Sequence, residues 1–193
     1  NPIPTTINGN SGYDELVVDY SDRHNNHDVI IDIATGNLNI HDYQTGNNSN
    51  LNLSDIEAFN VTTGRGNNLI DLGYDNFTDD TVNTGAGDDN IFTGKGFDLV
   101  DGGSGFDVLN LDFYNSVNGV TSSLNDNNSG EYVGSDSNVE FSNIEAINVF
   151  GSSYDDVLVA ITKDDDINNP IPTTINGNSG YDELVVDYSD RHN

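Results

Sequence analysis

Three consecutive nine-residue segments decide the fold: TGAGDDNIF (residues 84–92), TGKGFDLVD (93–101) and GGSGFDVLN (102–110). Each fits the pattern G-G-x-G-x-D-x-U-x, in which U is apolar and Thr twice replaces the first Gly. Glycine permits the positive-φ conformations that a tight turn needs. The pattern therefore predicts a six-residue turn followed by a three-residue strand, with the apolar eighth residue in the core.

Weaker copies of the pattern flank this run. Residues 63–71 fit with Asn68 at the Asp position, and residues 72–83 fit if three residues are inserted before Asp80. Single, degraded copies are residues 9–17 and 151–159. The eighth positions of the seven copies are Leu16, Ile70, Val82, Ile91, Val100, Leu109 and Leu158. A flexible acidic linker would show no such apolar beat, so these copies are predicted to fold.

The nine-residue period predicts a stack of turns. Two nonapeptides would make one circuit of about 18 residues, so turns two steps apart would lie about 4.8 Å from each other, the spacing of strands. Backbone carbonyls and Asp carboxylates of neighbouring turns would then face one another. Six to eight such oxygens suit Ca²⁺, and we expect Asp89 with Asp107 to hold one ion and Asp80 with Asp98 another.

The run at residues 63–110 resembles the repeats-in-toxin family of calcium-binding nonapeptide proteins. The resemblance implies an all-β fold, a parallel β-roll or β-solenoid, with Ca²⁺ as cofactor and export to the extracellular side. The carboxylate or amide ligands expected from it are Asp80, Asp89, Asp98, Asp107, Asn68, Asp156, Asp14 and Asp182. The turn residues expected around the ions are Thr84, Gly85, Ala86, Gly87, Thr93, Gly94, Lys95, Gly96, Gly102, Gly103, Ser104 and Gly105.

Two longer duplications organise the chain. Residues 1–25 recur unchanged as residues 169–193, an offset of 168, and residues 54–61 resemble residues 142–149. The first duplication predicts a unit of a tandem array followed by the start of the next unit; an added terminal copy, engineered or serving as a swapped strand, is the alternative. The predicted divisions are a first half-repeat at 1–104, a second at 105–168, and the next unit from 169.

The strong negative charge of the chain limits the classes of molecule that it can bind. Its 193 residues include 33 acidic and five basic side chains, a formal charge of −28, and no cysteine. Nucleic acids and anionic membranes would be repelled, and a thiolate metal site is excluded. No apolar run reaches the length of a membrane-spanning helix, and no signal peptide is predicted at Asn1. A body of this charge requires neutralisation, which favours hard cations.

The remaining segments also read as β structure. Residues 29–33 and 38–40 flank a turn and predict a hairpin, while residues 117–124 and 139–141 bracket a turn rich in Gly and Asn. No sustained period of 3.6 residues predicts a helix.

We expect a non-enzymatic structural unit of a large secreted or cell-surface protein, such as a filament, surface layer or adhesin stalk. Its partners would be calcium ions and neighbouring units of the same protein. The alternative is the calcium-binding accessory region of a secreted enzyme or toxin. A β-helical hydrolase of neutral glycans is less favoured, and a lyase of acidic glycans would need more than the few cationic side chains of the unit, Arg23, Arg65, Lys95 and Lys163.

Overall fold

The computed structural model describes residues 5–22, 27–34, 36–73, 78–126, 128–160 and 174–186. Within these ranges all regular structure is β, in eighteen strands that form two nine-stranded sheets. The predicted all-β class is confirmed. Both sheets are mixed, because each contains parallel and antiparallel pairs. In the same ranges, no helix has the length and apolar character needed to cross a membrane.

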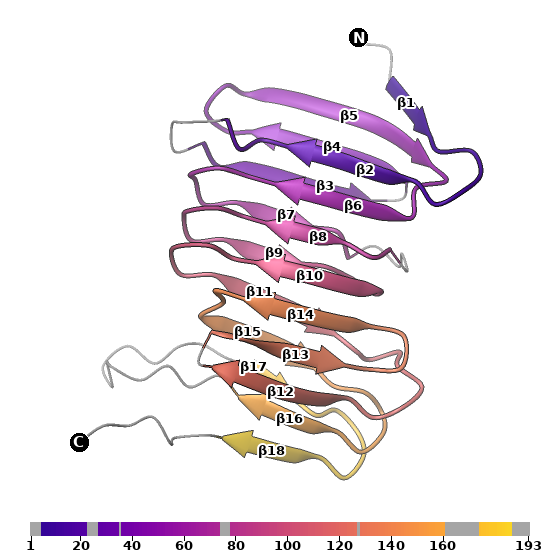
Figure 1. The fold of residues 1–193 in the computed structure, drawn as a ribbon, viewed down its shortest axis with the longest axis vertical. Coiled ribbons are helices and arrows are strands. Elements are labelled where there is room, and N and C mark those ends of the chain that lie inside the picture. Colours follow the sequence, from indigo (N-terminus) through magenta and orange to yellow (C-terminus); the bar gives the residue numbers. More distant parts are fainter. Residues whose placement is uncertain are drawn as a thin grey trace.

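The two sheets run along the whole length of the molecule (Figure 1). Sheet A consists, in spatial order, of β1 (Thr5–Asn8), β5 (Asn47–Ser54), β4 (Asn37–Asp42), β3 (Val29–Ala34), β7 (Leu69–Asp71), β9 (Asn90–Phe92), β11 (Val108–Asp112), β15 (Ala146–Phe150) and β17 (Thr174–Asn176). Sheet B consists of β18 (Glu183–Val186), β16 (Val157–Ala160), β12 (Thr121–Asp126), β13 (Ser129–Val133), β14 (Asn138–Ser142), β10 (Phe97–Asp101), β8 (Thr81–Asn83), β6 (Ala58–Thr62) and β2 (Glu15–Asp19).

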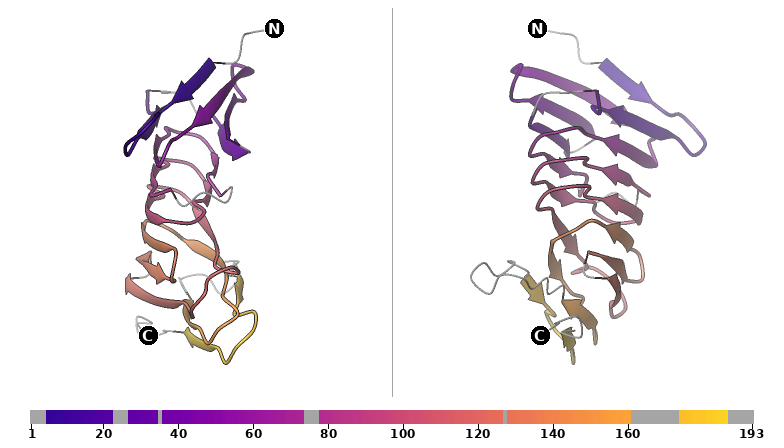
Figure 2. Two further views of the ribbon diagram at one scale, coloured as in Figure 1. Left: turned by 90° about the vertical axis from the view of Figure 1, so that its right-hand side faces the viewer. Right: turned by 60° about the vertical axis from the view of Figure 1, so that its left-hand side comes forward.

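From β6 to β11 the chain alternates between the two sheets, and successive strands in each sheet are parallel. Turned views show strands on two sides of a narrow stack, joined by turns (Figure 2). Ile91 pairs with Leu109, 18 residues on, as two nonapeptides per circuit predict. The preceding step, from Ile70 to Ile91, is 21 residues. The three extra residues are the insertion that the sequence predicts before Asp80.

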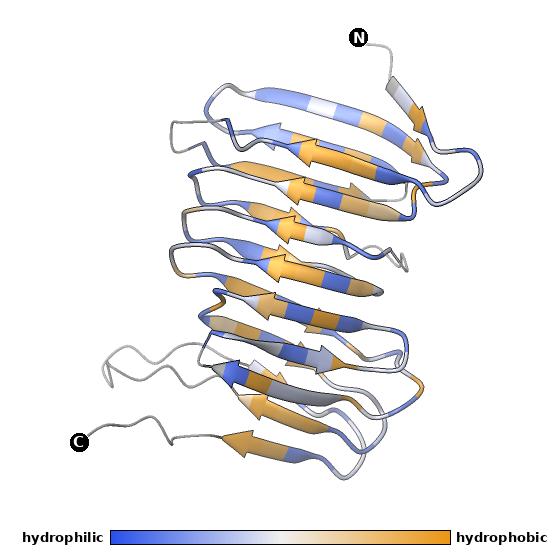
Figure 3. Ribbon diagram, in the orientation of Figure 1, coloured by the Kyte–Doolittle hydropathy of each residue, from blue (hydrophilic) through white to orange (hydrophobic). Residues whose placement is uncertain are grey.

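The core is a double column of apolar side chains between the sheets. The eighth residues of the nonapeptides alternate between sheet A and sheet B; Ile70, Ile91 and Leu109 come from sheet A, and Val82 and Val100 from sheet B, each at most 1% exposed. Hydrophilic residues occupy most of the turns at the edges (Figure 3). The predicted inward position of the eighth residue is therefore confirmed in the central copies.

Antiparallel strands interrupt the stack twice. β3 and β4 form the predicted hairpin, and β5 extends it as a third antiparallel strand. The second antiparallel group is β12–β14, where the sequence predicted two strands around a turn, and this prediction was incomplete. β13 lies between β12 and β14, and the first strand begins at Thr121 while Val117 is 65% exposed. The segment between the two expected strands is thus a strand itself rather than only a turn.

The two related segments 54–61 and 142–149 occupy equivalent turns on opposite sheets. The first leads from β5 in sheet A to β6 in sheet B, and the second leads from β14 in sheet B to β15 in sheet A. Each element lies nine strands after its equivalent; the two steps within β12–β14 stay in sheet B, and the other seven change sheet, so the second segment begins on the opposite sheet. The limits predicted for the half-repeats, 1–104 and 105–168, stay a prediction.

Candidate metal centre

The nonapeptide turns form two stacks on opposite edges of the molecule. The first stack contains turns 63–68, 84–89 and 102–107, each of which leads into a strand of sheet A. The second contains the described residues 72–73 and 78–80 and the turn 93–98, which lead into β8 and β10 of sheet B. Isolated bridges from Arg65 to Ala86 and from Ala86 to Ser104 join the first stack. The chain therefore brings the predicted turns together, layer upon layer.

The aspartates at the sixth position point inward and are almost completely buried. Exposure is 1% for Asp80 and Asp89, 4% for Asp98 and 0% for Asp107. Each carboxylate accepts a hydrogen bond from the backbone of the layer before it. The Asp80 amide donates to Asp98 Oδ1 at 3.0 Å, and the Asp89 amide donates to Asp107 Oδ1 at 2.9 Å. The pairs expected from the sequence are thus direct neighbours.

Glycine is required at two positions of every central turn. Gly85, Gly94 and Gly103 at the second position have φ between 83° and 89°. At the fourth position φ is also positive, and a Cβ on Gly105 would lie 1.8 Å from the Gly87 carbonyl oxygen of the layer before. A Cβ on Gly96 would likewise lie 2.0 Å from the Thr78 carbonyl oxygen. Close stacking of carbonyl-bearing turns therefore depends on residues without a side chain.

One oxygen of several buried carboxylates has no partner. Among the described residues, Oδ2 of Asp89, Asp98, Asp107 and the half-buried Asp14 is buried and accepts no hydrogen bond. A buried polar atom without a partner is unfavourable, and a buried carboxylate oxygen more so. Thr93 Oγ1, in the same turn as Asp98, is also buried without a well-aligned hydrogen bond, yet it lies near enough to lower the Asp98 pKa. These atoms have the chemistry of ligands for a hard cation.

Asn68 occupies the position where the other central turns carry Asp. The contacts of its side-chain nitrogen show which oxygen atoms surround this position. Its Nδ2 lies 3.1 Å from Thr63 Oγ1, 2.9 Å from the Gly66 carbonyl oxygen and 2.9 Å from Asp89 Oδ1. A hydroxyl, a carbonyl and a carboxylate of the next layer thus converge on one positively polarised nitrogen. In the following turn Asp89 replaces this amide, and within the described ranges its buried Oδ2 makes no well-aligned hydrogen bond.

Burial raises the pKa of the central carboxyls. It raises the pKa of Asp80, Asp98 and Asp107 to about 7, and it raises the pKa of Asp89. The charge of Asp98 contributes to the shift at Asp80, and hydrogen bonds from backbone amides oppose it throughout. In the absence of a cation, Asp80, Asp98 and Asp107 would therefore retain protons to near neutral pH.

The other expected ligands have different surroundings. Asp156 has donors for both oxygens, since Val120 N and Ser152 Oγ reach Oδ1 and Ser152 N reaches Oδ2. Asp182 Oδ1 accepts the Asp156 amide at 3.1 Å, so these two copies form a third, shorter ladder. Asp14 keeps a buried Oδ2 without a partner. The geometry thus favours the central turns over Asp156 as a place for an ion.

The described ranges contain no place where three or more His, Cys, Asp or Glu side chains converge. A cation in these turns would need backbone carbonyls and hydroxyls as most of its ligands, with one or two carboxylates. The expected turn residues fit that role unequally. Thr84 is buried and its Oγ1 donates to the Gly102 carbonyl, whereas Lys95 Nζ reaches Asp136 Oδ2 at 3.0 Å and is directed to another loop.

Two glutamates were missed as ligand candidates. Glu57 Oε2 accepts the Asp14 amide and Glu145 Oε2 accepts the Asp107 amide, both at 2.9 Å. In the next layer, each glutamate therefore accepts the amide hydrogen bond that an Asp carboxylate accepts in the central turns. The signal was available, because both glutamates belong to the related segments 54–61 and 142–149.

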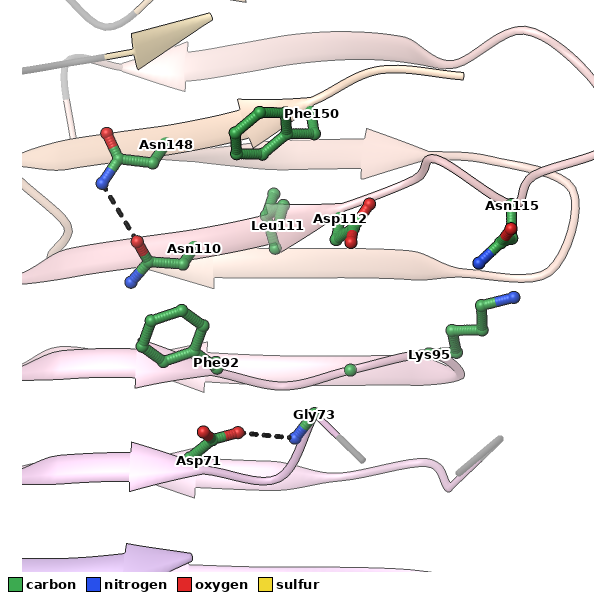
Figure 4. Close-up of a pocket in the computed structure, with 11 residues that line it drawn as sticks. Asp71, Gly73, Phe92, Lys95, Asn110, Leu111, Asp112, Asn115, Asn148 and Phe150 are labelled. Carbon is green, nitrogen blue, oxygen red and sulfur yellow. Dashed lines mark hydrogen bonds between the residues drawn. The ribbon is translucent and has the colours of Figure 1, made fainter. Parts of the chain in front are cut away.

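A separate groove of about 310 Å³ lies on the outer face of sheet A (Figure 4). Asn110 and Asn148 form a hydrogen-bonded ladder along it, next to the rings of Phe92 and Phe150. Its carboxylates, Asp71 and Asp112, accept backbone amides of Gly73 at 3.1 Å and Tyr114 at 2.8 Å. They belong to β7 and β11, which β9 separates, and therefore do not form an adjacent acid–base pair.

Comparisons with known proteins identify no relative. No protein-family model matches the chain, and neither a curated protein nor a solved structure matches it. The resemblance to the repeats-in-toxin family therefore rests on the nonapeptides themselves.

Proposed function

We propose that this chain is a calcium-stabilised structural unit of a large secreted or cell-surface protein, folded as a parallel β-roll of the repeats-in-toxin kind. Support for the β-roll comes from β6 to β11, where strands alternate between sheets and pair in parallel at steps of 18 or 21 residues. Positive-φ glycines at matching positions of three turns add further support.

The observation that carries the calcium proposal is the contrast between Asn68 and Asp89. The Asn68 amide nitrogen is surrounded by a hydroxyl, a carbonyl and a carboxylate oxygen. In the turns of Asp89, Asp98 and Asp107, this donor is replaced by an acceptor whose Oδ2 is buried without a partner among the described residues, whereas Asp80 Oδ2 accepts a hydrogen bond from Thr78 Oγ1. A cation resolves this excess of oxygen acceptors. Calcium, when bound, would supply the positive charge that allows stacked carboxylates to ionise together.

Side chains and backbone of this chain would contribute different ligands. Asp80, Asp89, Asp98 and Asp107 would provide carboxylate oxygens, and the glycine turns would provide carbonyl oxygens from two layers. An irregular set of many oxygens suits Ca²⁺, whereas Mg²⁺ requires a compact octahedron and retains its waters. Without the ion, two ionised carboxylates one layer apart (about 4.8 Å) would repel by roughly 3–4 kcal/mol at an effective dielectric constant of about 20, so the stack would ionise less readily.

Calcium dependence suits a protein that works outside the cell. Extracellular calcium modules bind with dissociation constants of about 10⁻⁴–10⁻³ M, so such turns would fill there and stay empty in the cytosol. The charge of −28 would then delay folding until export. A filament, surface layer or adhesin stalk is the role that best fits a repeated, rod-like unit, with other units of the same protein as partners.

The test is thermal melting of the full chain, followed by circular dichroism, in millimolar calcium, in magnesium and in a chelator. We expect a higher melting temperature of the β spectrum in calcium than in magnesium or chelator, because the buried carboxylates destabilise the metal-free stack. A melting temperature that is the same in calcium and in chelator would overturn the proposal. Melting equal in calcium and magnesium would overturn the assignment of the ion.

A further inference from the structure

The repeated 25-residue segment contributes two strands to each end of the molecule. Its first copy forms β1 and β2, the outermost strands of sheets A and B at one end. Its second copy forms β17 and β18, the outermost strands of the same sheets at the other end (Figure 1). One sequence therefore occupies the two opposite limits of the stack.

The two copies use opposite edges of the same strands. In the first copy, the Asp14 carbonyl accepts the amides of Glu57 and Ala58, which belong to the β6 layer. In the second copy, the Glu183 amide donates to the Asp156 carbonyl of the β16 layer at 2.8 Å. Asp14 and Glu183 are neighbouring positions of the same segment, so these bonds do not compete. A single segment can make both sets at once.

The carboxylate ladder follows the same rule. The Asp14 amide donates forward to Glu57 Oε2, whereas the carboxylate of its equivalent, Asp182, accepts backward from the Asp156 amide. The donor and the acceptor of this residue thus serve different layers. In a segment with a layer on both sides, the ladder would continue without interruption.

Side-chain burial shows what is missing at the second copy. Val18 is 6% exposed beneath the β6 layer, but its equivalent Val186 is 37% exposed. Leu16 is half-buried, and its equivalent Leu184 is 56% exposed. The sequence is identical, so the difference comes from the neighbouring layer. The exposed apolar residues of β18, Leu184 and Val186, are therefore identical to the residues of β2 that β6 covers at the other end of the molecule.

The strand count allows this layer to be supplied by another unit. β17 lies sixteen strands after β1, and β18 lies sixteen strands after β2. Four of these sixteen steps, within β3–β5 and β12–β14, stay in one sheet, and the other twelve change sheet. Because twelve is even, the segment returns to the same sheet, whereas the half-repeat, with seven such changes, does not. A following unit could therefore place its β5 beside β17 in sheet A and its β6 beside β18 in sheet B.

We propose that β17 and β18 are a shared joint: the repeated segment is the last layer of one unit and the first layer of the next, and its partner surface is the β5–β6 layer of a second unit of this sequence. The inference rests on the proposed function only in taking the chain as a repeat unit. According to this proposal, the strands of the two sheets continue to pair across the boundary between units, and the units are not separate bodies on a flexible connection.

The experiment compares Leu184→Asp in the full 193-residue chain and in a two-unit chain, in which residues 26–193 follow once more after residue 193. In the single chain Leu184 is largely exposed, and we expect the melting temperature to change by less than about 2 °C. In the two-unit chain Leu184 becomes a covered joint residue, and we expect a fall of more than about 5 °C. Leu99→Asp, at an outward leucine that is 49% exposed, should have little effect in either chain.

A second measurement does not depend on stability. Val17 pairs with Asn60 in the β2–β6 register, so Val185 of the first unit should pair with Asn60 of the second. Cysteines at these two positions should form a disulfide in the otherwise cysteine-free two-unit chain. Equal effects of Leu184→Asp in both chains, or failure of this disulfide to form, would overturn the joint. Calcium titration of the single chain is a separate readout, so loss of calcium binding would reject the proposed function and leave the joint to its own test.

Discussion

Replacing Asp98 by Asn should change the stability of the chain in opposite directions with and without calcium. Asp98 is 4% exposed, its pKa is raised to about 7, and its Oδ2 has no partner. Asn keeps the Oδ1 that accepts the Asp80 amide and removes the buried charge. The substitution also mimics Asn68, which the protein already uses at this position of the motif.

The expected sizes follow from the burial of the carboxyl. Keeping Asp98 ionised at pH 7.5 against a pKa near 7, rather than its ordinary 3.8, opposes folding by up to about 4 kcal/mol. Imperfect satisfaction of the new amide offsets about half of this. The calcium-free variant should therefore gain about 2 kcal/mol, or roughly 4–8 °C. In calcium at about a hundred times its dissociation constant, one ion stabilises the unmodified chain by about 2.7 kcal/mol that the variant does not gain. After the gain of about 2 kcal/mol from removing the buried charge, the variant should be less stable in calcium by about 1 kcal/mol.

The assay is thermal melting of both proteins in chelator and in saturating calcium. Asp88→Asn is the matched control, because Asp88 lies in the preceding nonapeptide of the sequence, is exposed, and accepts the Phe106 amide through an Oδ1 that Asn retains. It removes the same charge and should move both melting temperatures by little. If Asp98→Asn shifted the two melting temperatures in the same direction, the reasoning about a buried ligand carboxylate would be wrong.

Three further outcomes are expected. Asn68→Asp should add calcium capacity, because it replaces the amide that donates to Asp89 with a carboxylate; an unchanged calorimetric stoichiometry would speak against this. Gly105→Ala should destabilise the chain by more than about 2 kcal/mol, since its Cβ would meet the Gly87 carbonyl at 1.8 Å, whereas Gly46→Ala, at a positive φ with open space, should cost less; equal melting shifts would refute the stacking argument. In chelator, folded carboxyls with a pKa of about 7 bind more protons than unfolded ones near 3.8, so the melting temperature should fall as pH rises from about 4 to 7; a rise across that window would contradict it.

Sequence periodicity was sufficient for the central stack and for little beyond it. The apolar eighth positions, such as Ile91 and Leu109, predicted both the inward face and the 18-residue step, because one residue per turn repeats in the core. The three-residue insertion before Asp80 also reappears as a 21-residue step. These features depend on the number of residues in each turn and strand, and a tandem repeat shows that number directly.

Elements without such periodicity were harder to predict. β5 (Asn47–Ser54) is mostly polar and largely exposed, so its place in sheet A depends on pairing with β4 and β1 rather than on burial. β13 was hidden because its residues look like part of a turn, yet Tyr132 within it is completely buried. Tertiary pairing decides such strands, and a local pattern does not contain that information.

The candidate site shows the same division. The pairs of Asp80 with Asp98 and Asp89 with Asp107 could be inferred from spacing, since equal positions of successive circuits stack. The carbonyl surroundings could not be inferred, because they depend on turns brought together by the fold. The role of Glu145 at the end of the ladder was missed although the related segments 54–61 and 142–149 contained a signal for it.

Calorimetric titration of the metal-free chain tests the central claim most directly. The full 193-residue chain would be titrated with calcium at neutral pH, and with magnesium in parallel. The two stacks of buried carboxylates predict that at least two calcium ions bind per chain, with protons released as the carboxyls with raised pKa ionise, and that magnesium does not substitute. Absence of calcium binding, or binding of both metals with equal affinity, would contradict the account.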